Sequence, residues 1–215
     1  MKSTNWKKNL SLCAIALLAL QACNTKPSHK QEAKTKQDST VKATSGAQYA
    51  PVNTWIDDFR NFRTAVYQKD IDKQKTYFDF PLNADTTQIW ELVYDGAEEG
   101  KRPKTFPGTF TEADFVKHQS VIFTEAFTKS LLKEKSEKIT QADGYTTPKI
   151  NDGKDGYYMV ASYDKAAKTL TLTLSYPGGI DEEGNYVSEG EYAIIYFFKV
   201  ENNKYLKFEK VLFAG

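Results

Sequence analysis

The sequence predicts an α+β fold in which N-terminal helices pack on an antiparallel sheet, within a single domain at residues 51–215. Two observations support this prediction. Within residues 54–69 and 111–135, apolar residues recur every three or four positions, which is the period of a helix. After residue 143, apolar and polar residues alternate in runs that turn residues separate, which is the pattern of strands. Helices followed by hairpin-connected strands are typical of the α+β class.

The first predicted helix begins at the capping box Thr54-x-x-Asp57 and runs to about Lys69. In such a box the two side chains satisfy free N–H groups of the first helical turn. Asp57 and Asp58 are consecutive, so they cannot share one helix face, and both are expected to be solvated. The apolar face of this helix consists of Trp55, Ile56, Phe59, Phe62 and Val66.

A second, short helix is expected to start at Asp70, extend through Phe78 and end at Phe80-Pro81-Leu82. Residues 88–94 have an apolar centre and fit either a strand or a short helix. Residues 95–110 are rich in Gly, Pro, Glu and Lys, which predicts a long surface loop.

The next helical region begins at a second capping box, Thr111-x-x-Asp114, and extends towards Lys135. One bent helix or two short ones fit this region equally well. Apolar residues at helical spacing in it are Phe115, Ile122, Phe123, Ala126 and Phe127.

Four strands are expected, at residues 157–163, 169–175, 192–200 and 205–213. The second of them alternates leucine with threonine, the pattern of a half-buried strand. The third is apolar on both faces and is therefore expected at the centre of the sheet. Asn202-Asn203 between the last two suits a tight turn that needs positive backbone φ angles.

The order of these elements resembles the cone-shaped superfamily of nuclear transport factor and ketosteroid isomerase. The similarity rests on residues 59–66, then Asp70 and Phe80-Pro81-Leu82, and extends over residues 54–213. It implies a curved sheet that wraps around the helices and leaves a pocket at the open end. Some members of that superfamily are enzymes, and many bind ligands or partners. The long loops at 95–110 and 177–190 depart from its simplest members.

The N-terminus resembles the signal of a bacterial lipoprotein. A basic segment with Lys2, Lys7 and Lys8 precedes an apolar run at residues 10–20, which is too short to span a bilayer. Leu20-Gln21-Ala22-Cys23 then resembles a lipobox. The resemblance implies that residues 1–22 are removed and that Cys23 carries lipid. Since each buried methylene contributes about 0.8 kcal/mol, several acyl chains give a durable anchor.

Residues 23–50 are expected to be a flexible tether, because they contain almost no large apolar residue before Tyr49. As a random coil such a tether would hold the domain roughly 30 Å from the lipid. The whole chain has a formal charge of +1, but lysines of the leader and tether supply the excess. The domain is therefore acidic, which argues against a nucleic-acid partner.

Few residues suggest catalysis. Of two histidines, His29 lies in the tether and His118 near an apolar helix face, where a partly buried structural histidine is expected. Asp79 lies between Phe78 and Phe80, so burial could turn it into a general base, although such a residue more often caps the neighbouring turn. No cofactor motif or histidine- or cysteine-based metal motif is present, and the acidic loops at 151–156 and 181–185 fit turns better than calcium sites.

Aromatic residues are the remaining candidates for binding, with 13 Tyr and 13 Phe in the chain. A tyrosine-lined concave sheet could bind a small apolar molecule, a sugar or a peptide, although tyrosine is also simply a good strand residue. The candidate ligand-binding residues are Trp90, Tyr158, Tyr176, Tyr192 and Tyr196.

The sequence therefore predicts a lipid-anchored protein of the bacterial cell envelope with a non-catalytic ligand- or partner-binding domain. The segment after Cys23 lacks an acidic run of the kind that accompanies export to the cell surface, which favours the periplasmic face of the outer membrane. Two alternatives remain open. One is a pocket enzyme of isomerase or dehydratase type that uses a buried carboxylate. The other is an envelope scaffold with a filled cone and an exposed apolar patch.

Overall fold

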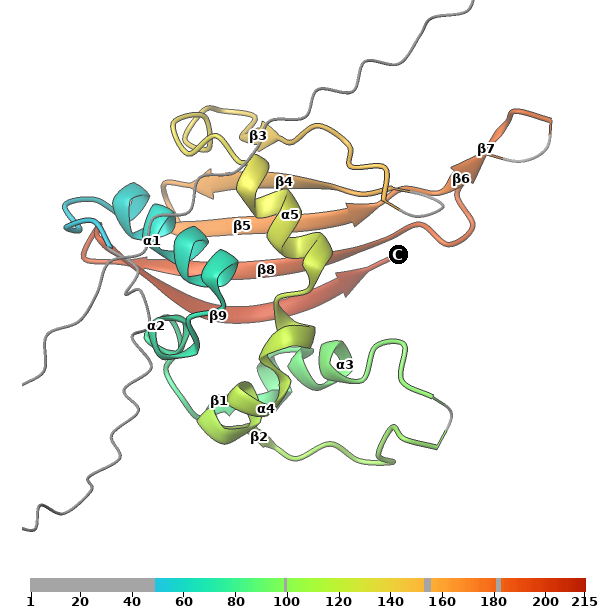
Figure 1. Cartoon of the computed structure of the whole chain (residues 1–215), viewed down its shortest axis with the longest axis horizontal. Coiled ribbons are helices and arrows are strands. Elements are labelled where there is room, and N and C mark those ends of the chain that lie inside the picture. The colour runs from blue at the N-terminus through green and yellow to red at the C-terminus, as the bar shows by residue number, and fades with distance from the viewer. Residues whose placement is uncertain (1–48, 99, 153–155, 181–182) are drawn as a thin grey trace, which may run out of the picture. The chain divides into compact units, whose positions relative to one another are not determined.

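The computed structural model describes residues 49–98, 100–152, 156–180 and 183–215, all of which belong to one compact unit, Thr44–Gly215. Figure 1 shows helices lying over one face of an antiparallel sheet. The helices are α1 (Trp55–Gln68), α2 (Ile71–Lys75), the 3₁₀ helix η1 (Ala84–Thr86), α3 (Ile89–Val93), α4 (Glu112–Ile122) and α5 (Glu125–Lys133). The strands are β1 (Leu82–Asn83), β2 (Thr109–Phe110), β3 (Tyr145–Thr146), β4 (Tyr158–Asp164), β5 (Thr169–Tyr176), β6 (Gly179–Ile180), β7 (Tyr186–Val187), β8 (Tyr192–Glu201) and β9 (Tyr205–Ala214).

Helix α1 confirms the first predicted helix and its cap. The Asp57 N–H donates to Thr54 Oγ1, and the Thr54 N–H donates to Asp57 Oδ2 at 2.9 Å. Lys69 ends the helix in the left-handed conformation, with φ at 55°. The side chains of Phe59 and Phe62 are fully buried, so the predicted apolar face is the face that packs in the core.

The chain docks on α1 two residues before the predicted domain boundary. The Asn61 side chain accepts a hydrogen bond from the Ala50 N–H at 3.0 Å and donates one to the Ala50 carbonyl at 2.8 Å. The Tyr49 hydroxyl donates to Asp70 Oδ2 at 2.6 Å. The expected tether of residues 23–50 therefore does not include Tyr49 and Ala50, and residues 23–48 lie outside the described part of the chain.

Helix α2 begins at Asp70 as predicted, but its α-helical part ends at Lys75 rather than at Phe78. Tyr77 and Phe78 continue the turn through N–H groups that donate to the carbonyls of Gln74 and Lys75, three positions back. Such bonds tighten the last turn into 3₁₀ geometry. This tightening directs the rings of Tyr77 and Phe78 into the core, where both are buried.

Helices α3, α4 and α5 decide two points for which the sequence allowed two structures each. Residues 89–93 form a helix rather than a strand. The 111–135 region forms two short helices, because Thr124 starts α5 by accepting the Phe127 N–H at 3.1 Å. The predicted loop at 95–110 ends in β2, which pairs with β1 through Leu82 and Phe110. That two-stranded pairing was not predicted.

The main sheet has the order β3-β4-β5-β8-β9, and every pair in it is antiparallel. Leu170, Leu172 and Leu174 of β5 are fully buried, which confirms the alternating pattern. Strand β8 is interior, as expected, but only one of its faces is fully buried, since Ile195 and Phe197 are half-buried. Asn202 and Asn203 adopt the predicted positive φ angles of 50° and 56°.

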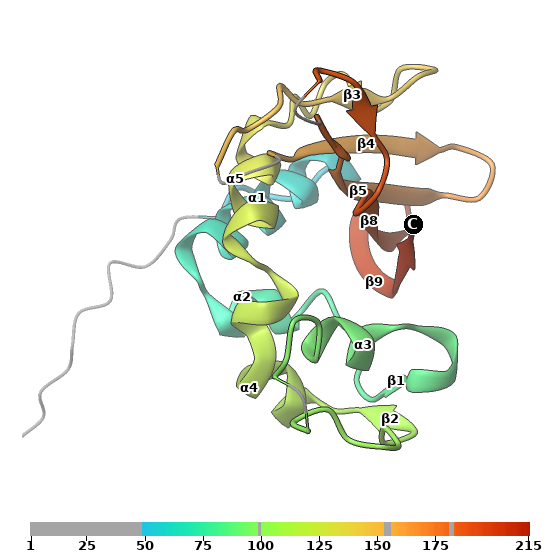
Figure 2. The same cartoon turned by 90° about the vertical axis from the view of Figure 1, so that its right-hand side faces the viewer.

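Helices α1 and α5 cover one face of this sheet, whereas α3 and α4 lie below its β9 edge together with β1 and β2 (Figure 2). A bulge interrupts the β8–β9 register between Phe197 and Phe198, and bulges of this kind bend a strand. Aromatic rings join the layers. Phe62 of α1 contacts the rings of Tyr77, Phe123 and Phe198 with centroid distances between 5.0 and 5.5 Å.

Candidate functional site

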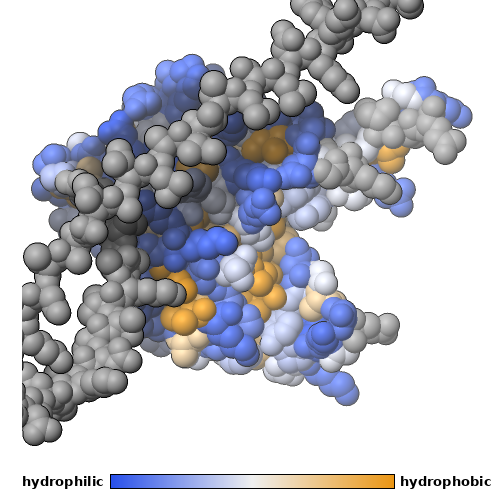
Figure 3. All heavy atoms as spheres, viewed as in Figure 1, coloured by the Kyte–Doolittle hydropathy of each residue, from blue (hydrophilic) through white to orange (hydrophobic). Residues whose placement is uncertain are grey.

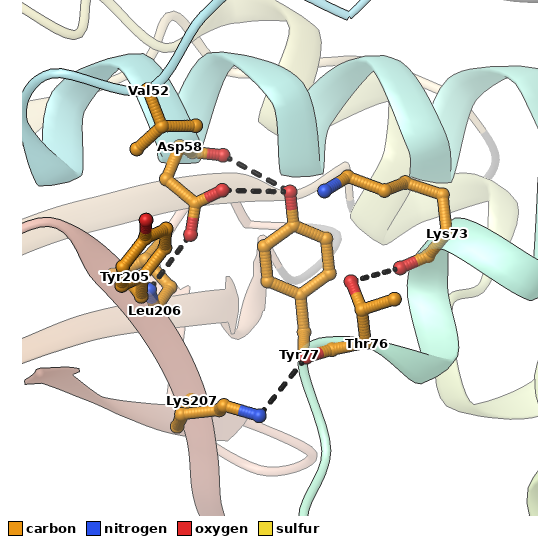
Figure 4. Close-up of a pocket in the computed structure, with 8 residues that line it drawn as sticks. All are labelled: Val52, Asp58, Lys73, Thr76, Tyr77, Tyr205, Leu206 and Lys207. Atoms are coloured by element: carbon orange, nitrogen blue, oxygen red, sulfur yellow. Dashed lines mark hydrogen bonds between the residues drawn. The ribbon is translucent and has the colours of Figure 1, made fainter.

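Two hollows on the described surface have polar groups in their walls. The first, which we call the Asp58 pocket, has a volume of about 320 Å³ and lies between α1, α2 and the start of β9 (Figure 4). Its lining residues are Val52, Asp58, Lys73, Thr76, Tyr77, Tyr205, Leu206 and Lys207.

Asp58 is buried with 3% of its surface exposed, so the expectation of a solvated Asp58 was wrong. Its Oδ2 accepts the Leu206 N–H at 2.8 Å, and its Oδ1 accepts the Tyr77 hydroxyl at 3.3 Å (Figure 4). Burial raises the pKa of Asp58, and the hydrogen bond from Leu206 opposes that rise. Asp57, one position earlier, serves the helix cap instead. The signal for Asp58 was a polar residue between Trp55 and Phe62 on the apolar face.

The two lysines of the pocket differ in their partners. Lys207 Nζ donates to Asp79 Oδ1 at 2.7 Å and to the Thr76 carbonyl at 3.1 Å. Lys73 forms no ion pair with the described residues, and its ammonium lies over the Tyr77 ring, 5.0 Å from the centroid. The Asp79 side chain is 66% exposed. The possibility that Asp79 is a buried general base is therefore not supported, because Phe78 is buried in the core while Asp79 faces Lys207 and solvent.

These contacts indicate that Asp58 mainly has a structural role, because it links α1 to β9 and to Tyr77. A general base needs a lone pair that is free to take a proton from a substrate. Asp58 uses both oxygens to hold β9 and the end of α2 against α1. A buried backbone N–H such as that of Leu206 would otherwise be left unpaired at a cost of about 1–3 kcal/mol.

The second hollow, which we call the helix groove, has a volume of about 560 Å³ and lies between the end of α1 and the α4–α5 junction. Figure 3 shows hydrophobic surface between polar patches on the face that carries these helices. The lining residues are Val66, Tyr67, Lys69, Gln119, Ser120, Phe123, Glu125, Thr128, Lys129 and Leu132.

Gln119 is the unusual residue of the helix groove. Only 7% of its surface is exposed, yet its side-chain amide forms no hydrogen bond with any described residue. The amide atoms are not among the enclosed unpaired atoms of the described residues, so they reach the surface of the groove, where water or a ligand can bond to them. The sequence carried a signal for this residue, since Gln119 lies four positions from both Phe115 and Phe123 on an apolar helix face.

The charges around the helix groove are partly paired. Lys129 Nζ forms ion pairs with Glu125, at 2.9 Å, and with Asp152. Lys69 is exposed and has no ion pair with a described residue. The groove therefore offers a free ammonium and a free amide beside apolar side chains.

The five residues predicted to bind a ligand line neither hollow. Tyr176 and Tyr192 stack with their ring centroids 4.4 Å apart, and Tyr158 is half-buried on β4. Tyr196 is a core residue whose hydroxyl donates to the Ile122 carbonyl at 2.9 Å. Trp90 is buried, and its Nε1 has no hydrogen-bond partner in the described chain. Tyr176 pairs with Tyr192 across β5 and β8, and Tyr196 lies four positions after Tyr192, so these three side chains share one face of the sheet with the buried Ile194. Tyr158 lies on the opposite face, since its neighbour Met159 is the buried one.

His118 lies beside the Trp90 and Tyr94 rings, at centroid distances of 6.2 and 6.4 Å. It is half-buried, as expected, and burial lowers its pKa. Among the described residues no group of three His, Cys, Asp or Glu could hold a metal ion. Residues 153–155 and 181–182 of the two acidic loops, and Cys23, lie outside the described residues.

None of the described helices is long and apolar enough to cross a bilayer. No family model matches the chain, and no match was found among curated proteins or solved structures.

Proposed function

We propose that this protein is a lipoprotein anchored through Cys23 on the periplasmic face of the outer membrane, and that its folded part binds a ligand in the helix groove without catalysis. The leader, the lipobox and the polar composition of residues 24–48 support the location. The helices that cover one face of an antiparallel sheet support the cone-like resemblance, although the groove lies among the helices.

The observation that carries the binding proposal is the unpaired amide of Gln119. A groove of about 560 Å³ lies within the usual range for small-ligand sites, about 300–1,000 Å³. Such sites combine apolar walls with a few polar groups that orient the ligand. Gln119 fits this description because the protein leaves its donors and acceptor unused.

At the Asp58 pocket, the enzyme alternative would depend on Asp58, since Asp79 is exposed and paired with Lys207. Both Asp58 oxygens accept hydrogen bonds that hold the fold together, so a non-catalytic role agrees better with these contacts.

The scaffold alternative is favoured by exposed apolar surface at Tyr67, Leu132 and Val116, which are 61%, 43% and 46% exposed. Two of these residues line the helix groove, so a protein partner could use the same surface.

Location is tested by mass spectrometry of the chain purified from bacterial membranes. We expect a product that begins at a diacylated or triacylated Cys23, and we expect Cys23→Ser to leave the membrane fraction. If the Cys23 thiol is unmodified, or if residues 1–22 are still present, the proposal of a lipid anchor is wrong.

Binding is tested by two-dimensional NMR of the full chain in lipid nanodiscs against a panel of short peptides, methyl glycosides and organic acids. We expect one class to cause saturable shifts at the groove residues that Gln119→Ala abolishes. Gln141→Ala is the matched control, because Gln141 is an exposed glutamine away from the groove. If no class shifts the groove signals, the proposal is wrong.

A further inference from the structure

Strand β8 carries apolar side chains on the face of the main sheet that points away from the core. Ala193, Ile195 and Phe197 alternate with the buried Ile194 and Tyr196, so they lie on this opposite face, which we call the outer face. Figures 1 and 2 show the described helices on the core side or at the β9 edge, and none on the outer face. Antiparallel sheets normally carry polar residues on a solvated face. The apolar side chains of β8 therefore indicate that another surface covers the outer face.

The outer face combines large and small side chains in a regular way. Strand β5, the neighbour of β8, carries only threonine and serine on this face. Thr173 pairs with Ile195, and Thr171 pairs with Phe197. A ridge formed by Ile195 and Phe197 therefore lies directly beside a trough formed by Thr171 and Thr173.

This relief is complementary to itself. Consider a two-fold axis that lies between two facing copies, parallel to the strands and midway between β5 and β8. It places β8 of each copy over β5 of the other. Ile195 of each copy then faces Thr173 of the other, and Phe197 faces Thr171, because each of these pairs lies in one row across the sheet. Packed sheets cross at about 30°, so the match is closest near the middle of the face.

The area of the outer face also fits a second copy. Val160 of β4 and Leu212 of β9 lie in the row of Thr173 and Ile195, and the same axis brings them together. Four long strands about 4.8 Å apart, with eight residues of about 3.3 Å each, give a face of roughly 500 Å² per copy. Two such faces bury roughly 1,000 Å², which is the lower limit for a specific interface and predicts a weak dimer.

We propose that two copies of this chain associate through their outer faces, with the ridge of each copy in the trough of the other. A second copy is favoured over a different protein because ridge and trough lie side by side on one face and complement each other about the two-fold axis. The helix groove lies among α1, α4 and α5, away from the outer face, so the dimer does not depend on ligand binding there.

The experiment is sedimentation equilibrium of the full chain in a detergent that matches the density of the buffer. We expect the mean protein mass to rise from one copy to two as the concentration rises through the micromolar range. Two chains that share a micelle by chance would raise the mass of every variant equally, so all variants are compared at one ratio of detergent to protein.

An exchange of ridge and trough tests the register. Ile195→Thr removes part of the ridge and should weaken the dimer at least about tenfold, since each dimer loses two apolar contacts. Thr173→Ile fills the trough and should weaken the dimer by a similar factor, because the facing side chains are then too large. The double variant should restore the affinity to within about threefold, since each isoleucine again faces a threonine.

Val116→Thr is the matched control, because Val116 is an exposed apolar residue of α4 and lies away from the outer face. It should leave the dimer unchanged. Thermal unfolding checks that each variant is folded. If a variant at Thr173 or Ile195 unfolds, the same exchange at Thr171 and Phe197 replaces it.

Three results would overturn the proposal. The first is a mass of one copy at every concentration. The second is a dimer that Val116→Thr weakens and Ile195→Thr leaves unchanged, because the interface would then lie among the helices. The third is a double variant as weak as the two single losses combined, because the two outer faces then do not meet in this register.

Discussion

Glu134 is a buried carboxylate that the fold leaves without a partner. It is 3% exposed, and neither of its oxygens accepts a hydrogen bond from a described residue. Arg63 donates to the Glu134 backbone carbonyl at 3.0 Å and not to the carboxylate. Burial raises the pKa of Glu134 to about 8, and the charge of Arg63 only partly opposes this rise.

This carboxylate should make the free energy of unfolding depend on pH. Below about pH 4.5 both folded and unfolded chains hold the proton, so Glu134 has no effect. Between pH 4.5 and 8 the unfolded chain releases the proton and the folded chain keeps it, so stability falls as pH rises. Above pH 8 the loss is complete, and at about 1.4 kcal/mol per pKa unit it is at most about 5 kcal/mol.

We therefore expect Glu134→Gln to stabilise the protein at pH 8.5 by about 1–3 kcal/mol, less than the maximum because a glutamine amide must also be buried. The gain should shrink towards pH 5. Urea unfolding at several pH values measures it. Glu201→Gln, at an exposed glutamate, is the control and should show no pH-dependent gain. Parallel pH profiles for Glu134→Gln and the unaltered protein would refute this prediction.

At the scale of elements, two glycines show how local surroundings decide the cost of one substitution. Gly144 and Gly96 have nearly equal φ angles, 66° and 67°. A Cβ on Gly144 would lie 2.3 Å from the Ala161 carbonyl oxygen of β4, whereas a Cβ on Gly96 would meet nothing within 4 Å. Gly144 therefore lets the chain pass close to β4 immediately before β3.

We expect Gly96→Ala to cost about 1 kcal/mol, the strain of a left-handed alanine. Gly144→Ala should cost at least about 2 kcal/mol more, because the β3–β4 pairing must move to relieve the clash. Chemical denaturation of both variants gives the difference. Equal losses would mean that β3 moves away from β4 without penalty.

The elements with strong local signals were the ones the sequence could predict. Both capping boxes and the alternation of β5 depend on neighbouring residues, and all three were confirmed. The β1–β2 pair was missed because it joins residues 82–83 to 109–110 across a long loop. The helix groove was missed for the same reason: Lys69 and Gln119 are fifty residues apart, and only the packing of α1 beside α4 and α5 brings them to one hollow.

Burial of Asp58 could not be predicted from spacing alone. A carboxylate on an apolar face is normally unfavourable, and the Leu206 N–H that compensates it comes from the far end of the chain. Such polar residues on apolar faces, Asp58 and Gln119 alike, mark the places where sequence periodicity and tertiary contacts disagree. Asp58 accepts a hydrogen bond from the Leu206 N–H, whereas the Gln119 side chain has no hydrogen bond with a described residue.

At the scale of the whole molecule, Asn61 holds the first described residues, Tyr49 and Ala50, against the fold. This side chain is 4% exposed and holds both backbone groups of Ala50. The Tyr49 hydroxyl is held by Asp70, which also caps α2. The first described residues are therefore held against α1 and α2.

We expect Asn61→Ala to release residues 49–50 and to lower the free energy of unfolding by about 1–3 kcal/mol, because it removes two hydrogen bonds from a buried side chain. Amide exchange at Ala50 should become faster by more than the global loss of stability explains, while exchange in β5 and β8 follows the global loss. Asn53→Ala is the matched control, since Asn53 lies in an exposed turn and contributes only its backbone N–H to the cap. If Ala50 exchange changes only in proportion to global stability, the hydrogen bonds of Asn61 do not act separately from the core, and the position of residues 49–50 is set by α1 packing instead.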